Sequence, residues 1–260
     1  METIQVGPAP RLAVSVAGKG TLLLFLHGIR GNRGNWTRQL DFFSRQGFKA
    51  AAWDARGYGQ SADYDGALQF ETHFTGDVLR VAEHFKAAKM HLVGLSMGGR
   101  IARNFALHHP ERLHSLVLAS TNPGFDALSP EGVKRFVTER RTAKPEGLRK
   151  LLGSRARAGA YEELLESVSS IHEASYQKTL EASVAQDRFA PIEDIRVPTL
   201  VIAGDEDTVY PPSMAKDMAR RIPGAELQLM RGVGHLGNLE QPDEFNQAVL
   251  QFLKRQEKPS

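Results

Sequence analysis

Cysteine is absent from this chain of 260 residues, and its absence excludes several kinds of chemistry. Without a thiol the protein has no disulfide framework, no thiolate metal site and no cysteine nucleophile. A serine that acts as a nucleophile would therefore have no sulfur competitor.

A long apolar run is absent as well. No stretch approaches the roughly 18 uninterrupted apolar residues of a membrane-spanning helix. Residues 1–20 include Glu2, Gly7 and Pro8 and contain no apolar core of a signal peptide. We therefore expect a cytoplasmic protein without a membrane partner.

The chain also lacks a large excess of charge of one sign. It has 33 basic and 30 acidic residues, a net charge of +3 and no long basic tract. This balance of charge is too even to indicate a nucleic-acid partner, but it is compatible with a small anionic substrate. The length fits one α/β domain with a large core.

Short apolar runs alternate with amphipathic stretches along most of the chain. The apolar runs are residues 22–26, 48–53, 91–95, 115–119, 199–203 and 227–230, and the amphipathic stretches are 35–46, 70–86, 100–108, 211–222 and 242–254. Such alternation is typical of βαβ units. It predicts an α/β fold in which helices flank a mostly parallel twisted sheet.

The alternation breaks once, between residues 123 and 191. This part of the chain shows no convincing strand but has amphipathic segments at 129–142, 147–157, 161–169 and 173–186. We therefore expect a core domain formed by residues 1–122 and 192–260, with 123–191 inserted as a helical cap. An insertion just after a strand's carboxyl end lies where open α/β sheets bind ligands, so the cap could act as a lid.

A Gly-x-Ser-x-Gly motif at residues 94–98 follows one apolar run and precedes an amphipathic stretch. This context is typical of a nucleophile elbow, a sharp strand-to-helix turn that exposes a serine hydroxyl. Gly94 and Gly98 lack the Cβ atoms that would clash in such a turn. The turn directs free N–H groups toward the space beside Ser96, where negative charge develops during acyl transfer. Ser96 is therefore the candidate nucleophile.

A serine hydroxyl needs a base, usually a histidine that a carboxylate orients. Among nine histidines, His235 stands out because a glycine-rich loop carries it after the last apolar run. Asp205, Glu206 and Asp207 lie together and compete for the role of the orienting carboxylate. Asp207, in the loop after the preceding apolar run, is the preferred candidate, with Asp205 and then Asp126 as alternatives.

The order Ser96, Asp207, His235 is the chain order of the α/β-hydrolase triad and differs from the orders in chymotrypsin-like and subtilisin-like enzymes. Further segments match that family in the right sequence. They are His27-Gly28, which resembles its oxyanion loop, residues 54–61, which resemble its Asp-x-Arg-Gly-x-Gly-x-Ser turn, and Gly204-x-x-Asp207-x-x-x-Pro211, which resembles its acid loop. The chain thus resembles an α/β-hydrolase fold serine hydrolase over nearly its whole length.

That resemblance implies two oxyanion donors, the backbone N–H groups of Ile29 and Met97, and a structural role for residues 54–61. Residues 235–241 are similar to the corresponding segment of enol-lactonases and small carboxylesterases. Hydrolases that cleave carbon–carbon bonds of meta-cleavage products typically carry tryptophan where this chain has Leu236, which counts against that activity. Serine rather than aspartate at the elbow closes the dehalogenase alternative.

Two residues are candidates for substrate contacts. Arg30, beside the oxyanion loop, could hold a substrate carboxylate in a bidentate pair. A salt bridge at the surface is the more ordinary role for Arg30, as it is for Arg33 and Arg100. Leu236, next to the candidate base, is the second candidate.

The sequence therefore predicts a hydrolase that cleaves an ester or lactone of a small molecule through an acyl-enzyme on Ser96. No metal or organic cofactor is implied. Hydrolysis of a carbon–carbon or amide bond, or cofactor-free perhydrolysis, is an alternative on the same triad. A small-molecule receptor on a hydrolase scaffold is the non-enzymatic alternative. Acyl length and oligomeric state stay open.

Overall fold

The computed structural model describes residues 1–125, 129–142, 145–185 and 191–256. Its strands are β1 (Glu2–Val6), β2 (Leu12–Ala17), β3 (Leu22–Leu26), β4 (Lys49–Trp53), β5 (Met90–Leu95), β6 (Leu113–Ala119), β7 (Thr199–Gly204) and β8 (Glu226–Met230). They form one sheet in the order β1-β2-β4-β3-β5-β6-β7-β8. β1, β2 and β4 pair antiparallel, and all neighbours from β4 to β8 pair parallel. The predicted α/β fold with a mostly parallel sheet is confirmed.

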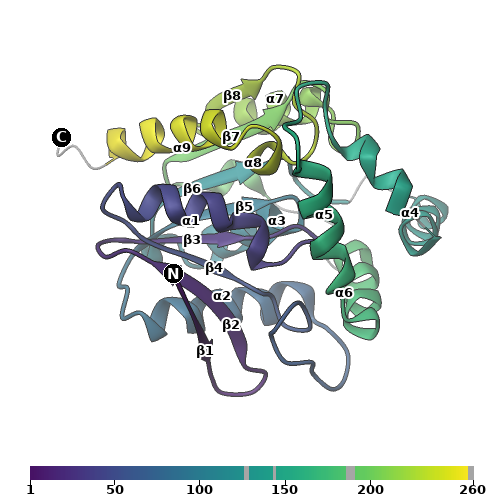
Figure 1. The fold of residues 1–260 in the computed structure, drawn as a ribbon, viewed down its shortest axis with the longest axis horizontal. Coiled ribbons are helices and arrows are strands. Elements are labelled where there is room, and N and C mark those ends of the chain that lie inside the picture. The colour runs from purple at the N-terminus through teal and green to yellow at the C-terminus, as the bar shows by residue number, and fades with distance from the viewer. Residues whose placement is uncertain (126–128, 143–144, 186–190, 257–260) are drawn as a thin grey trace.

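Helices cover both faces of this sheet. The α-helices are α1 (Thr37–Ser44), α2 (Phe70–His84), α3 (Met97–His108), α4 (Pro130–Thr142), α5 (Ala160–Ser169), α6 (Glu173–Ala185), α7 (Pro212–Arg221), α8 (Gly237–Glu240) and α9 (Pro242–Gln256). Short 3-10 helices are η1 (Arg33–Trp36), η2 (Pro110–Arg112), η3 (Pro145–Leu151) and η4 (Ile192–Asp194). α1 and α9 pack on one face, and α2, α3 and α7 pack on the other (Figure 1).

The alternation of side chains along each strand divides the core into two apolar layers. In β3, Leu24 faces the layer that contains Phe74 and Phe105, whereas Phe25 faces the layer that contains Trp36 and Phe43. Both kinds of β3 side chain are fully buried, since helices cover both faces. This is why the parallel strands appear in the sequence as continuous apolar runs.

The insertion between β6 and β7 consists of α4, η3, α5 and α6 among the described residues. In Figure 1 these helices stand at one end of the sheet, beyond the strands. Hydrogen bonds link the insertion to the loops that follow β7 and β8. Ser154 N–H donates to Glu206 Oε2 at 2.7 Å, and His235 N–H donates to Leu151 O at 2.7 Å. The insertion therefore lies at the carboxyl end of the parallel strands.

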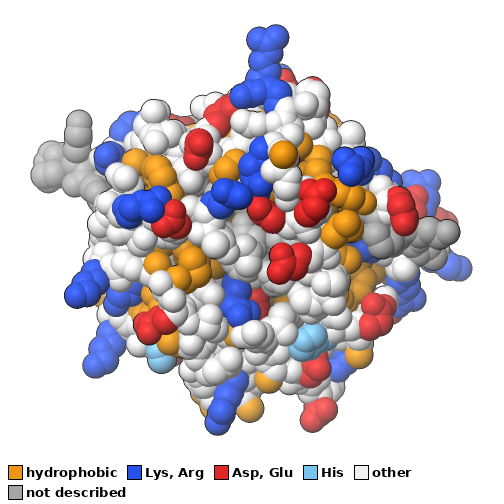
Figure 2. Space-filling view, in the orientation of Figure 1, with side chains coloured by type: hydrophobic (Ala, Val, Ile, Leu, Met, Phe, Trp, Pro, Cys, Tyr) orange, Lys and Arg blue, Asp and Glu red, His pale blue; other side chains and the backbone are white. Residues whose placement is uncertain are grey.

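The surface carries charges of both signs. Basic and acidic side chains are interspersed on the face seen in Figure 2, as expected for a chain without a long basic tract. Among the described helices, none combines the length and the hydropathy needed to cross a bilayer.

Candidate active site

Ser96 occupies the tight turn between β5 and α3. Its φ angle is +55°, a region that side-chain-bearing residues rarely adopt outside constrained sites. The Ser96 N–H donates to Ala119 O at 2.9 Å, and Thr121 Oγ1 donates to Ser96 O at 2.7 Å. β6 and the residues after it therefore hold the turn in its strained conformation.

Two glycines make this turn possible. A Cβ atom on Gly94 would lie 2.2 Å from Gly98 O, and one on Gly98 would lie 2.2 Å from Leu26 O. Real Cβ atoms never approach backbone oxygens so closely, because the van der Waals repulsion is prohibitive. The two glycines are therefore required for steric reasons, as they are in a nucleophile elbow.

His235 and Asp207 lie side by side in the loops that follow β8 and β7. His235 Nδ1 donates to Asp207 Oδ2 at 2.8 Å. The other carboxylate oxygen, Oδ1, accepts from Val209 N–H at 2.8 Å and from Tyr210 N–H at 3.0 Å. Burial alone would raise the pKa of Asp207, but the charge and hydrogen bond of His235 and the two N–H donors hold it below its ordinary value. Asp207 is thus an ionised partner for the imidazole.

The competing acids are placed differently. Asp205 Oδ1 accepts from Gly232 N–H at 2.7 Å and so ties together the loops after β7 and β8. Asp126 lies outside the described residues. Of the two described candidates, the structure brings Asp207 and not Asp205 to His235.

Ser96 and His235 are both almost buried, with exposed fractions of 8% and 6%. Among the described residues, no hydrogen bond joins the Ser96 hydroxyl to the imidazole. In free enzymes catalytic hydrogen bonds of this kind are often long and shorten when substrate binds.

The loop that carries Ile29 approaches the elbow closely. A Cβ atom on Gly28 would lie 3.3 Å from Ser96 Cβ, so the two segments are in contact. Within the described residues, neither Ile29 N–H nor Met97 N–H has a hydrogen-bond acceptor. Met97 begins α3, where N–H groups have no partner within the helix. The structure thus provides two unpaired donors on segments that adjoin Ser96.

His27 fixes the base of this loop. Its Nδ1 donates to Gly28 O at 2.7 Å and its Nε2 accepts from Ala55 N–H at 3.0 Å, which defines one neutral tautomer. Burial lowers the pKa of His27, although the Gly28 hydrogen bond and the Asp54 charge oppose that shift. His27 therefore acts as a structural link between the loop that carries Ile29 and the turn at residues 54–61.

That turn has the structural contacts expected of it. Arg56 forms two hydrogen bonds of 2.7 Å with the carboxylate of Asp77 on α2. The buried Asp54 forms an ion pair with Arg33 and accepts from Gln60 N–H at 2.8 Å. Arg33 thus takes the ordinary ion-pair role.

Arg30 differs from Arg33 because no acidic side chain pairs with it among the described residues. Its guanidinium donates to Arg140 O and lies 5.3 Å from the centre of the Tyr176 ring. Arg100 also points inward, donating to Ser183 O at 3.0 Å. Leu236 is 8% exposed and packs in the apolar layer with α1 and α9.

Two residues of this region were not predicted from the sequence. Arg140, on α4, stacks its guanidinium on Phe136, and burial lowers its pKa while the nearby Tyr210 and Tyr176 oppose that shift. Glu240, on α8, is fully buried and binds backbone N–H groups beside His235. The only sequence signal for Glu240 is an acid within an otherwise uncharged segment, five residues after the candidate base.

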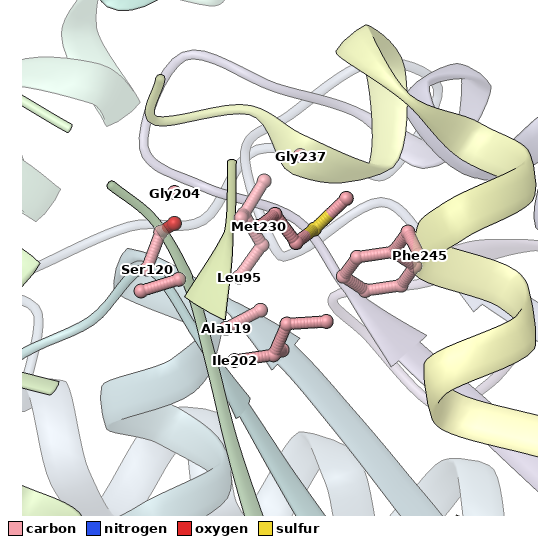
Figure 3. A pocket seen from close by; sticks show the side chains of 9 residues that line it. Leu95, Ala119, Ser120, Ile202, Gly204, Met230, Gly237 and Phe245 are labelled. Atoms are coloured by element: carbon pink, nitrogen blue, oxygen red, sulfur yellow. The ribbon is translucent and has the colours of Figure 1, made fainter. Parts of the chain in front are cut away.

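The space between the ends of β5, β6, β7 and β8 and helix α9 is filled. Figure 3 shows side chains of β6, β7, β8 and α9, among them Ile202, Met230 and Phe245, around a gap too small for a water molecule. Leu95, which precedes Ser96, also borders this gap. The packed side chains therefore adjoin the strand end that carries Ser96 and leave no room for a ligand there. The described residues hold no group of three or more His, Asp or Glu side chains suited to a metal ion.

Comparison with known proteins agrees with this fold. A family model described as serine aminopeptidase, S33, matches residues 19–241. The fold defines the protein as an α/β-hydrolase. The chain belongs to the serine aminopeptidase S33 family and is an enzyme, a hydrolase.

Individual relatives cover nearly the whole chain. The 2-hydroxy-6-oxononadienedioate/2-hydroxy-6-oxononatrienedioate hydrolase of Escherichia coli is 29% identical over 96% of this chain and 93% of its own length. A thermophilic esterase from Thermogutta terrifontis, solved with malate bound, has a TM-score of 0.85 and 26% identity over 99% of this chain and 100% of its own. The enol-lactonase from Burkholderia xenovorans has a TM-score of 0.81 and 25% identity over 94% and 96%.

Proposed function

We propose that the protein hydrolyses a carboxylic ester or lactone of a small molecule through an acyl-enzyme on Ser96. Ser96 Oγ attacks the carbonyl carbon while His235 Nε2 takes the hydroxyl proton. The N–H groups of Ile29 and Met97 stabilise the oxyanion. His235 then protonates the departing alkoxide, and water activated by the same imidazole releases the acid.

The observation that carries this proposal is the 2.8 Å hydrogen bond between His235 Nδ1 and Asp207. It occurs in a chain whose Ser96 has the strained backbone of a nucleophile elbow. The bond holds Nδ1 protonated, so that Nε2 has the lone pair that a base needs. A binding module would have no use for this tautomer or for the backbone strain. The receptor alternative is therefore less well supported.

Two observations favour esters and lactones as substrates. One of the structural relatives is an esterase and another an enol-lactonase. Leu236 also stands where enzymes that cleave carbon–carbon bonds typically carry tryptophan. Carbon–carbon cleavage is nevertheless the second candidate, because the Escherichia coli relative is named for a dienedioate substrate of that type.

We further propose that residues 123–191 act as a cap over the site and, with residues 1–122 and 192–260 as the core, set substrate choice. Contacts of the insertion with the loops after β7 and β8 support this role. A cleft of about 530 Å³ opens along the seam between core and insertion and is lined by Asn32 and Ser167, among others. Such a seam offers a path toward the oxyanion loop.

For substrate contacts we propose Arg30 and Leu236. Arg30 follows the proposed oxyanion donor Ile29 directly, and its guanidinium lacks a carboxylate partner among the described residues. The Arg30 side chain is half-buried, so its guanidinium is partly desolvated without a counter-ion, and an anionic substrate group would supply that partner. Malate in the related esterase and a dienedioate in the name of the Escherichia coli relative are both dicarboxylates, which supports an acidic substrate.

The test is a comparison of steady-state turnover on three sets of compounds. We expect p-nitrophenyl esters of short acids and small lactones to be hydrolysed faster than dienoic ketoacids. Every substrate that the wild-type protein turns over should lose its turnover in Ser96→Ala. Turnover confined to dienoic ketoacids would favour the carbon–carbon candidate, and a single acylation without turnover would favour the receptor.

A further inference from the structure

Glu240 is a buried carboxylate that three backbone N–H groups share. Its side chain has no exposed surface. Oε1 accepts from Leu236 N–H at 2.9 Å, and Oε2 accepts from Gly234 N–H at 2.9 Å and from Gly153 N–H at 2.6 Å. Gly234 and Leu236 flank His235, whereas Gly153 belongs to the insertion. One side chain therefore bonds both sides of the candidate base and the insertion.

The backbone of the insertion also forms hydrogen bonds with the backbone of His235 and of Glu240. His235 N–H donates to Leu151 O at 2.7 Å, and Arg157 N–H donates to Glu240 O at 3.1 Å. The fit leaves no spare room, because a Cβ atom on Gly153 would lie 2.6 Å from both Gly232 O and Gly234 N. Any shift of residues 151–157 would therefore displace the backbone of His235.

The carboxylate has no other partner that would explain it. No salt bridge involves Glu240 among the described residues, and burial raises its pKa against the opposing effects of the three N–H donors and of the His235 charge. Hydrogen bonds to a carboxylate are stronger than those between neutral groups. Loss of an acceptor would leave a buried N–H group unsatisfied at the catalytic loop or in the insertion.

We propose that Glu240 is a positioning residue that couples the insertion to the catalytic base, so that the imidazole of His235 is aligned only while residues 151–157 are seated against its loop. This inference rests on the proposed role of His235. It differs from a role of the insertion in binding, because it predicts that the insertion affects the rate even for a substrate too small to contact it.

The first test substitutes Glu240→Gln, which keeps the size of the side chain but replaces one acceptor oxygen with an NH₂ group. With p-nitrophenyl acetate we expect kcat to fall roughly ten- to a hundredfold while KM stays unchanged, since a misalignment of about 1 Å has this effect on rate. A purely structural role would lower the melting temperature and the active fraction without this split between kcat and KM in the folded protein.

The second test disturbs the same contact from the insertion. Gly153→Ala adds a methyl group that pushes the insertion off the His235 loop, and it should lower kcat in the same way. Gly147→Ala is the matched control, because its added Cβ would have no atom within 4 Å. The control should keep the wild-type kcat and KM.

Combining the two changes tests whether they act through one contact. If they do, Glu240→Gln with Gly153→Ala loses little more than the worse single variant; multiplied losses would contradict the coupling. A wild-type kcat in folded Gly153→Ala, or a raised KM with unchanged kcat, would overturn it too. His235→Ala separates this failure from a failure of the proposed function. If His235 were not the base, His235→Ala would keep its activity.

Discussion

His235 Nδ1 and Asp207 Oδ2 lie 2.8 Å apart although the two residues are 28 positions apart in the chain. The parallel arrangement of β7 and β8 brings them together, since the loops after both strands emerge at the same edge of the sheet. The neighbouring acid, Asp205, leaves the same strand but faces Gly232. The two acids should therefore differ in their effect on catalysis.

Asp207→Asn should lower kcat/KM about ten-thousandfold, because an amide cannot hold the imidazole in the required tautomer. Asp205→Asn should lose much less, since its carboxylate only ties two loops together. Rates with p-nitrophenyl acetate and melting temperatures of both variants check this. If Asp205→Asn were the inactive, folded variant, the assignment of the acid would be wrong.

Ser96→Ala should lower hydrolysis by a factor of about ten thousand or more, leaving only the contribution of binding and of the oxyanion donors. Its fold should persist, because the side chain of Ser96 supports no hydrogen bond to another described residue. Circular dichroism and initial rates measure both effects. Retention of more than a tenth of the activity would refute the nucleophile.

The rate at low ester concentration should rise with pH through one ionisation between about pH 5 and 8, where histidine side chains change charge. Only neutral imidazole can accept the serine proton. The pKa of Asp207 is lowered, so its carboxylate stays ionised throughout this range and adds no second step. A profile that is flat, with chemistry shown to be rate-limiting, would contradict the role of His235.

The lowered pKa of Asp207 also makes the stability of the fold depend on pH. A carboxyl group whose pKa is lower in the folded state stabilises the fold above its unfolded value of about 3.9, and this contribution is lost as pH falls through the folded value. The difference in unfolding free energy between the wild type and Asp207→Asn should therefore shrink below about pH 4. Denaturant titrations between pH 7 and pH 3 measure it, and a constant difference would exclude the linkage.

The sequence predicted the parallel part of the sheet well because its strands are buried on both faces. The run at residues 22–26 coincides with β3, and that at 199–203 with all but the last residue of β7. β1 was missed because it is an edge strand whose side chains are mostly exposed, and the adjoining β2 contains a serine among its small apolar residues. Neither strand had a clear apolar run of its own.

The proposed triad was accessible from the sequence because glycine and strand signals surround each member. Arg140 had no such signal, because it reaches Arg30 from a helix 110 positions further along the chain. Glu240 was missed for a related reason, since its partner Gly153 is 87 positions away. Contacts between the insertion and the core depend on tertiary packing that local patterns do not encode.

Arg30 and Arg140 lie side by side, since the Arg30 guanidinium donates to Arg140 O. If Arg30 and Arg140 receive an anionic group of the substrate, Arg30→Met and Arg140→Met should lower kcat/KM for the p-nitrophenyl monoester of succinate much more than for p-nitrophenyl butyrate. The two acyl groups have the same chain length and differ in the terminal carboxylate. Charge-assisted pairs contribute about 1.5–3 kcal/mol, which corresponds to a selective loss of roughly ten- to a hundredfold.

Arg45→Met is the matched control for this comparison. It removes the same charge from the exposed end of α1, where Arg45 pairs with Asp41 at 2.6 Å. If its selectivity equalled that of the wild type, a general effect of net charge would be excluded. Equal losses for both esters in Arg30→Met would instead mean that Arg30 only supports the oxyanion loop, since misplacement of Ile29 N–H would slow every substrate alike.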